Sequence, residues 1–176
     1  MREPVIVING FCERYQRRLE EMSGFLAGKA FEHLIFLCRS DFSEDALKKL
    51  PARKVSVISS EVYDPQALLP VLEEKSKDAE LIIFDSGYAG EELAVRLACR
   101  KKGVSATKVK SFYEKDGKKY IEKSVYSNHM TGTFSVNKMP CCLSLAPGEP
   151  SGKFWNRRRN RFWNSVSCLE LCKGIP

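Results

Sequence analysis

Residues 80–104 constrain the fold of this chain more than any other stretch, because they carry the signals of a strand, a tight turn and a helix in direct succession. Residues 81–84 form an unbroken apolar run, which is typical of a parallel strand buried on both faces. Ser86, Gly87 and Gly90 then permit a sharp turn. The stretch is therefore predicted to form a βα unit, the building block of a parallel sheet.

The helix predicted after this turn has a narrow apolar stripe of Ala94, Leu97 and Ala98. Its charges agree with the helix dipole, because acidic residues fall in the first turn and basic residues fall in the last. Gly103 is expected to adopt the left-handed conformation that ends many helices.

Three further strands are predicted before residue 80, over residues 4–8, 33–38 and 55–58, where short apolar runs recur. Asn9 and Gly10 follow the first of these runs, and both residue types tolerate a turn.

Helices are predicted between these strands. Apolar residues at helical spacing indicate the first helix over residues 15–26, with Arg18 and Glu21 on the side that faces solvent. A short helix is predicted over residues 43–50. Another begins at residues 64–65, where Asp at the cap and Pro at the first helical position favour a helix start.

The pattern after residue 103 changes from helical crossovers to hairpins. An Asp116-Gly117 pair between two apolar alternating segments is a strong hairpin signal, so the strands are expected to become antiparallel here. The strands predicted in this region cover residues 106–113, 119–125, 131–136 and 141–145.

Four strands that alternate with helices need crossover connections, which produce a parallel sheet. The predicted fold class is α/β, a three-layer and mostly parallel Rossmann-like sheet with antiparallel strands added near the C-terminal end.

Ligands of such sheets bind beyond the carboxyl ends of the strands, at the point where the strand order reverses. If the strands over residues 4–8 and 81–84 are neighbours, two turns flank this crevice. The candidate nucleotide-binding residues in these turns are Asn9, Gly10, Ser86, Gly87, Tyr88 and Gly90.

These candidates also have a simpler structural explanation, because glycine after a strand usually serves only turn geometry. Asp85 beside the crevice is equally well explained as a cap. Glu91 and Glu92 would repel an anion at the start of the following helix, and neither GxGxxG nor GxxxxGK[ST] is present. We predict no catalytic residue and no metal site, because His129 has no evident partner and none of the seven cysteines forms a CxxC pair.

Length and charge divide the chain into an α/β domain over residues 1–150 and a tail over residues 151–176. The net charge is +7, but most of the excess lies in the tail, so the charge does not by itself indicate a nucleic-acid-binding domain. No apolar run approaches the ~20 residues of a membrane-spanning helix, and a cytoplasmic location is expected.

Four segments carry a resemblance to a known family: EVYDP, DSGYAGEELAVRLACRKKGVSA, DGKKYIEKSVYSNHMTGTFSV and LSLAPGE. With these segments, residues 61–148 resemble the N-terminal domain of an electron transfer flavoprotein alpha subunit, and the earlier strands extend the resemblance to roughly the first 150 residues. It implies an adenine nucleotide alpha hydrolase-like fold. It also implies an alpha–beta heterodimer that carries FAD and takes electrons from flavin dehydrogenases.

In that family FAD sits mainly in a second alpha-subunit domain, and this chain has no match to the family's FAD-contact residues. The expected role is therefore scaffold and partner docking, with the beta subunit and flavin dehydrogenases as partners and no flavin bound by the chain alone. The second hypothesis is a stand-alone domain that binds an adenine nucleotide such as AMP.

The third hypothesis is nucleic-acid binding through the tail, where aromatic residues that could stack on bases are interleaved with arginines. These aromatic residues are Phe154, Trp155, Phe162 and Trp163. Two simpler explanations remain open, a basic extension that packs a few aromatics on the domain and a coding sequence that has shifted frame. Because periodic apolar positions stop at residues 147–148, the domain is expected to fold without the tail.

Overall fold

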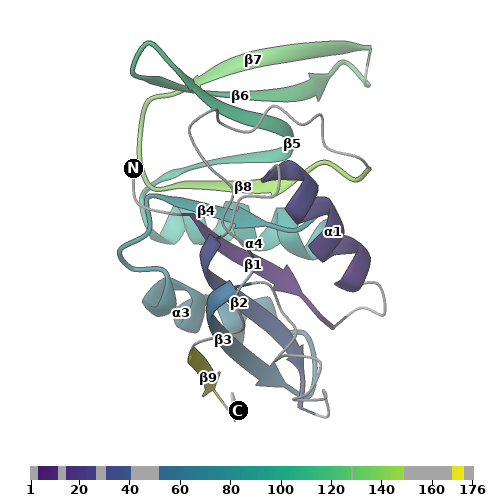
Figure 1. Cartoon of the computed structure of the whole chain (residues 1–176), viewed down its shortest axis with the longest axis vertical. Coiled ribbons are helices and arrows are strands. Elements are labelled where there is room, and N and C mark those ends of the chain that lie inside the picture. The colour runs from purple at the N-terminus through teal and green to yellow at the C-terminus, as the bar shows by residue number, and fades with distance from the viewer. Residues whose placement is uncertain are drawn as a thin grey trace.

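The computed structural model describes residues 4–11, 15–26, 31–40, 52–127, 129–148 and 168–172. One mixed sheet of nine strands runs through these residues in the order β7-β6-β5-β8-β4-β1-β2-β3-β9 (Figure 1). The strands are β1 (Val5–Asn9), β2 (Phe31–Arg39), β3 (Ala52–Ser60), β4 (Leu81–Phe84), β5 (Val104–Lys115), β6 (Lys118–Val125), β7 (Met130–Val136), β8 (Cys141–Leu145) and β9 (Cys168–Cys172). The helices are α1 (Tyr15–Phe25), α3 (Pro65–Lys75) and α4 (Tyr88–Arg100). The helix predicted over residues 43–50 lies outside the described residues.

The centre of the sheet is parallel, as predicted. β1 pairs with β2 on one side and with β4 on the other, and β2 continues to β3. Two of these strands, β1 and β4, consist entirely of buried residues, whereas β3 is buried over residues 55–58 and less so at its ends. The predicted adjacency of the first strand and the strand over residues 81–84 is therefore confirmed.

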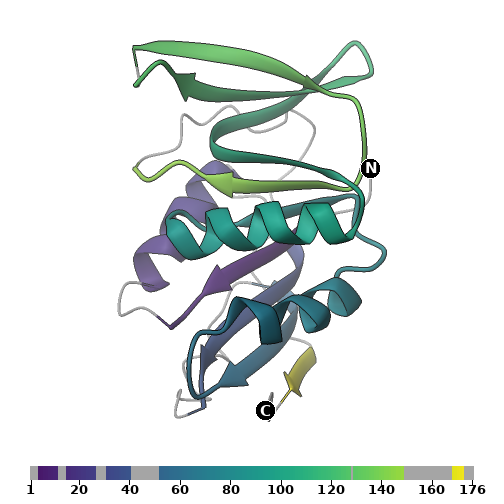
Figure 2. The ribbon, with the colours of Figure 1, turned by 180° about the vertical axis from the view of Figure 1, so that it is seen from behind.

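Helices cover both faces of the sheet, which gives three layers. α1 lies on one face and α3 with α4 on the other, so the two views show them alternately in front of the sheet (Figures 1 and 2). Met22 and Phe25 of α1 are buried in one core, and Leu72 of α3 and Leu97 of α4 in the other. None of the described helices combines the length and apolar content needed to cross a bilayer.

The second half of the chain adds an antiparallel extension. β5 pairs with β6 and β6 with β7, and the β5–β6 turn has Asp116 at φ 52° and Gly117 at φ 72°. Two positive φ angles are those of a type I′ turn, which the Asp-Gly pair predicts. β8 departs from the hairpin pattern, because it returns to the sheet body and pairs in parallel with both β4 and β5.

The end of α4 corrects one expectation. Lys102, not Gly103, is left-handed, with φ 53°. The N–H of Gly103 donates to the carbonyl of Ala98 at 2.8 Å and that of Lys102 to Cys99 at 3.1 Å, which is a Schellman motif. Glycine is needed at residue 103 for space, because a Cβ there would lie 2.1 Å from the carbonyl oxygen of Pro140.

A last strand was not predicted from the sequence. β9 pairs in parallel with β3 at the edge of the sheet opposite the hairpins. The tail residues 151–167, with the aromatic and arginine residues of the third hypothesis, lie outside the described residues.

Candidate functional site

The candidate site lies where β1 and β4 end side by side. Both strands point the same way, and the chain leaves them toward opposite faces of the sheet, through α1 after β1 and through α4 after β4 (Figures 1 and 2). This is the point at which the strand order reverses, and it is where ligands of doubly wound sheets bind. We call it the switch point.

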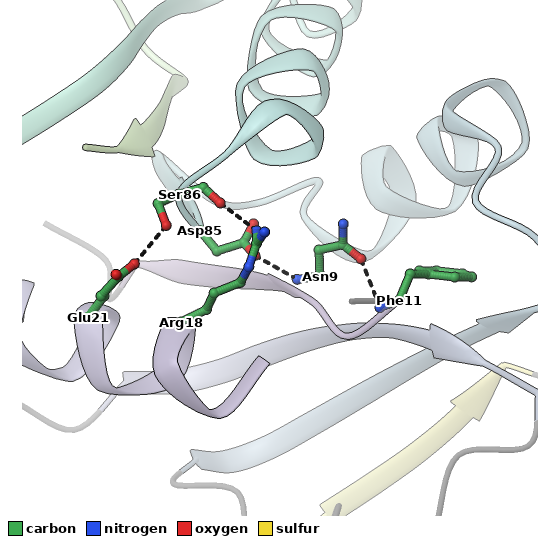
Figure 3. Close-up of polar contacts among 6 residues, drawn as sticks. All are labelled: Asn9, Phe11, Arg18, Glu21, Asp85 and Ser86. Atoms are coloured by element: carbon green, nitrogen blue, oxygen red, sulfur yellow. Dashed lines mark hydrogen bonds and ion pairs between the residues drawn. The ribbon is translucent and has the colours of Figure 1, made fainter. Parts of the chain in front are cut away.

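Asp85, the residue directly after β4, occupies the centre of the switch point. It is 1% exposed, and its backbone N–H donates to the carbonyl of Val7 at 3.1 Å. Its Oδ2 accepts the N–H of Asn9 at 3.2 Å. The Oδ1 of Asn9 in turn accepts the N–H of Phe11 at 3.0 Å, which closes the turn after β1 (Figure 3).

Arg18 reaches the switch point from α1 (Figure 3). Its Nη1 lies 2.6 Å from Oδ2 of Asp85, and the same nitrogen donates to the carbonyl of Ser86. The side chain of Arg18 is 21% exposed and that of Asp85 is 2% exposed, so the ion pair is largely removed from solvent. The prediction that Arg18 faces solvent is wrong.

A second contact from α1 reaches the same turn. Ser86 Oγ donates to Oε2 of Glu21 at 2.6 Å (Figure 3). Glu21 also pairs with Arg17 at 3.2 Å on the outer side of the helix. Glu21 is thus oriented toward the turn after β4, and the sequence-based prediction that it faces solvent is also wrong.

Burial and the ion pair act in opposite directions on Asp85. Burial raises the pKa of Asp85 to about 6, while the Arg18 guanidinium and the N–H of Asn9 lower it. Desolvation disfavours the carboxylate, and neighbouring positive charge and donors favour it. Asp85 is 1% exposed, and its Oδ2 contacts both the Arg18 guanidinium and the N–H of Asn9, so it links α1 to the turn after β1.

Glycines make the close approach of these elements possible. Gly87 has φ 103°, in the left-handed region that favours glycine. A Cβ on Gly90 would lie 2.1 Å from the carbonyl oxygen of Asp85, so α4 packs directly on the turn that precedes it. Gly10 is equally confined, because a Cβ there would lie 2.4 Å from the ring of Phe36.

The predicted nucleotide-binding residues lie in the two turns of the switch point, but they differ in solvent exposure. Asn9 and Ser86 are buried, whereas Tyr88 is 94% exposed. The sequence analysis missed Arg18 and Glu21. A signal for Arg18 was present, because Arg18, Met22 and Phe25 share one helix face at spacings of four and three residues and the latter two are buried.

His33, His129, Cys141 and Cys142 lie away from the switch point. Nε2 of His33 lies 2.8 Å from Oγ of Ser56 between neighbouring strands, and His129 is exposed in the turn after β6. Cys141 and Cys142 are buried in β8. Within the part of the chain that the structure describes, no group of three or more His, Cys, Asp or Glu side chains could hold a metal ion.

A search of known proteins found sequence similarity between this chain and one flavoprotein subunit. No family model matches the chain. The chain is 33% identical over 111 residues to the putative electron transfer flavoprotein subunit YgcQ of Escherichia coli strain K12. The similarity covers 63% of this chain and 37% of YgcQ, so the chain spans less than two fifths of the length of the relative that it matches.

Proposed function

We propose that this chain serves as an alpha-type subunit of an electron transfer flavoprotein, as the scaffold and partner-docking part of a complex in which FAD carries electrons from dehydrogenases. The observation that carries the proposal is the 33% identity to a putative electron transfer flavoprotein subunit over 111 residues. The three-layer sheet with its antiparallel extension is the fold that the sequence resemblance implies.

The switch point supports a scaffold role for the chain. Arg18 and Asp85 meet beyond the ends of β1 and β4, where a Rossmann-like sheet would hold a phosphate. An incoming phosphate would have to replace Asp85 as the partner of Arg18. The flavin of the proposed complex is therefore held mainly by parts of the assembly other than this crevice.

Co-expression with a beta-type electron transfer flavoprotein subunit tests this function. We expect the two chains to co-elute in gel filtration with bound FAD, and this chain alone to elute without flavin absorbance. Co-expression with an unrelated α/β protein is the control. Separate elution of the two subunits would contradict the proposal, as would stoichiometric flavin on this chain alone.

The second candidate is an adenine-nucleotide site that takes AMP. It is favoured by the guanidinium of Arg18, which lies with Asn9, Gly10, Ser86, Gly87 and Gly90 around the paired ends of β1 and β4. The exposed ring of Tyr88 at the start of α4 would be free to stack on a base. In this hypothesis the phosphate competes with Asp85 for Arg18.

Calorimetric titration with AMP distinguishes the two candidates. If the nucleotide site exists, Asp85→Asn should tighten AMP binding because it releases Arg18, and Arg18→Gln should abolish it. Arg17→Gln, on the outer side of the same helix, is the control. Absence of heat at millimolar AMP in both the native protein and Asp85→Asn would eliminate the nucleotide site and leave the subunit proposal untouched.

A further inference from the structure

A half-open groove lies beside α4, and none of its lining residues belongs to the switch point. Its volume is about 590 Å³, and it is bounded by α4, the start of β5 and the β6–β7 hairpin. This size falls within the ~300–1,000 Å³ that is usual for small-molecule sites. The apolar residues that form most of its wall include Val95, Val104, Ala106, Ile121, Val125 and Phe134.

Two large apolar side chains are exposed at this groove. Val95 of α4 is 46% exposed and Phe134 of β7 is 44% exposed, and both belong to its lining. A single exposed apolar side chain is ordinary, but two that come from separate elements and line one concavity form a surface that a ligand can cover. The groove therefore offers apolar area that the fold itself leaves uncovered.

Gly132 keeps this surface open. A Cβ on Gly132 would lie 2.8 Å from Cε2 of Phe134 and 3.5 Å from Cγ1 of Val125. The ring of Phe134 thus lies back along β7 over the glycine. A larger residue at position 132 would displace the ring from this position.

The charges that line the groove are all positive. Lys123 and Lys138 belong to the lining, and no Asp or Glu does. Nearby lysines have carboxylate partners, since Lys108 lies 3.9 Å from Glu91 and Lys119 lies 3.8 Å from Glu80. Among the described residues no ion pair involves Lys123 or Lys138, and no carboxylate of the groove lining competes for their ammonium groups.

We propose that this groove binds an amphiphilic carboxylate, a molecule with an unbranched apolar chain and one terminal carboxylate. The chain lies against Val95, Ala106 and Phe134, and the carboxylate meets the ammonium groups of Lys123 and Lys138. Apolar walls with a few polar groups that fix orientation are the usual design of such sites. The proposal goes beyond the electron-transfer function and does not depend on it.

Calorimetric titration with decanoate, below its micelle concentration, tests the ligand class. Decanol has the same chain without the charge, and decyltrimethylammonium has it with the opposite charge. We expect saturable 1:1 binding of decanoate, binding of decanol weaker by about tenfold or more, and no binding of the cation. Equal binding of all three, or no saturable binding of decanoate at millimolar concentration, would overturn the proposal.

Variants test the location. Val95→Trp should block the groove from a partly exposed position on α4 and abolish decanoate binding, and Ala106→Phe should do the same from β5. Lys123→Gln and Lys138→Gln should each weaken binding about tenfold, the loss expected for one charge-assisted hydrogen bond. Lys115→Gln at the hairpin tip is the control and should bind as the native protein does.

Circular-dichroism melts confirm that each variant folds. Undiminished binding of decanoate by both folded blocking variants would overturn the location. Sedimentation of the same samples tests the other occupant. A dimer of the native protein that Val95→Trp dissociates would assign the groove to a second copy of the chain and would likewise overturn the proposal.

Discussion

Nη1 of Arg18 lies 2.6 Å from Oδ2 of Asp85, so a helix on one face of the sheet is tied to the turn that starts a helix on the other face. The same guanidinium group also holds the carbonyl of Ser86. One side chain thereby fixes α1 against β4 at the point where the two halves of the sheet meet.

Removal of Arg18 should be strongly destabilising. Arg18→Gln leaves the buried carboxylate of Asp85 without its counter-ion, and breaking a buried pair in this way costs about 3–5 kcal/mol. Urea unfolding at pH 7 measures the loss. Arg17→Gln is the matched control, because Arg17 is 64% exposed and its pair with Glu21 should contribute less than about 0.5 kcal/mol. Similar losses for the two variants would contradict this account.

The contribution of Asp85 to stability should fall as the pH rises from about 4 to above 6. Burial raises the pKa of Asp85 from 3.8 to about 6, so the folded protein binds a proton that the unfolded chain has already released. This contribution is complete below pH 3.8 and is lost as the pH passes through 6; at 1.36 kcal/mol per pKa unit it amounts to about 3 kcal/mol. Urea unfolding across this pH range measures it. Asp85→Asn should remove this part of the decrease in unfolding free energy with pH. An unchanged pH dependence in Asp85→Asn would show that other groups cause the decrease.

Gly90→Ala should destabilise the protein more than Gly132→Ala. At Gly90 the new methyl group would meet the backbone oxygen of Asp85 at 2.1 Å, which only a shift of the chain can relieve. At Gly132 it would meet the ring of Phe134 at 2.8 Å, and a side chain can turn away. We expect about 1–3 kcal/mol for Gly90→Ala and less for Gly132→Ala in thermal or urea unfolding. The reverse order would mean that the turn after β4 is looser than described.

The cysteines should differ sharply in reactivity. Cys99 is exposed on α4, whereas Cys38, Cys141 and Cys142 are buried. Burial raises the pKa of both Cys141 and Cys142 to about 12, so little thiolate is present at pH 8. Brief labelling of the native protein with a disulfide reagent, followed by peptide mapping, should modify Cys99 well ahead of these three. Labelling in urea is the control and should make all four reactive.

The tail prediction can be tested by deletion. The sequence predicts that residues 1–150 fold without residues 151–176, and the deletion would also remove β9 from the edge of β3. Because ordering each residue of an edge strand costs about 1–2 kcal/mol, we expect the hydrogen bonds of β9 to be largely offset and Tm to fall by less than ~8 °C. Removal of residues 173–176 alone is the control. A larger fall would show that the tail belongs to the fold.

The sequence predicted the backbone plan well where local chemistry decides it. Oδ1 of Asp64 accepts the N–H of Gln66 at 2.8 Å at the start of α3, as the Asp-Pro pair predicts. The Asp116-Gly117 turn and the bounds of β8 were also predicted correctly. Each of these features depends on a few consecutive residues.

What the sequence could not supply depends on partners distant in the chain. The partner of Arg18 lies 67 residues away, and a charged residue on a helix is by itself an ordinary surface residue. β9 was missed because an edge strand is defined by its neighbour rather than by its own pattern. Gly103 was predicted to be the left-handed residue at the end of the helix, but Lys102 has that conformation, and the carbonyl of Pro140 is what requires glycine at position 103.

The position of β8 between β4 and β5 has a consequence for the order in which the chain assembles. During synthesis β4 and β5 both emerge before the strand that separates them in the finished sheet. The hairpins from β5 to β7 join residues close in sequence and form early, whereas the sheet body closes only when residues 141–145 insert. Until then β4 has an open edge that another strand could occupy, so a nascent chain halted before residue 141 is expected to aggregate.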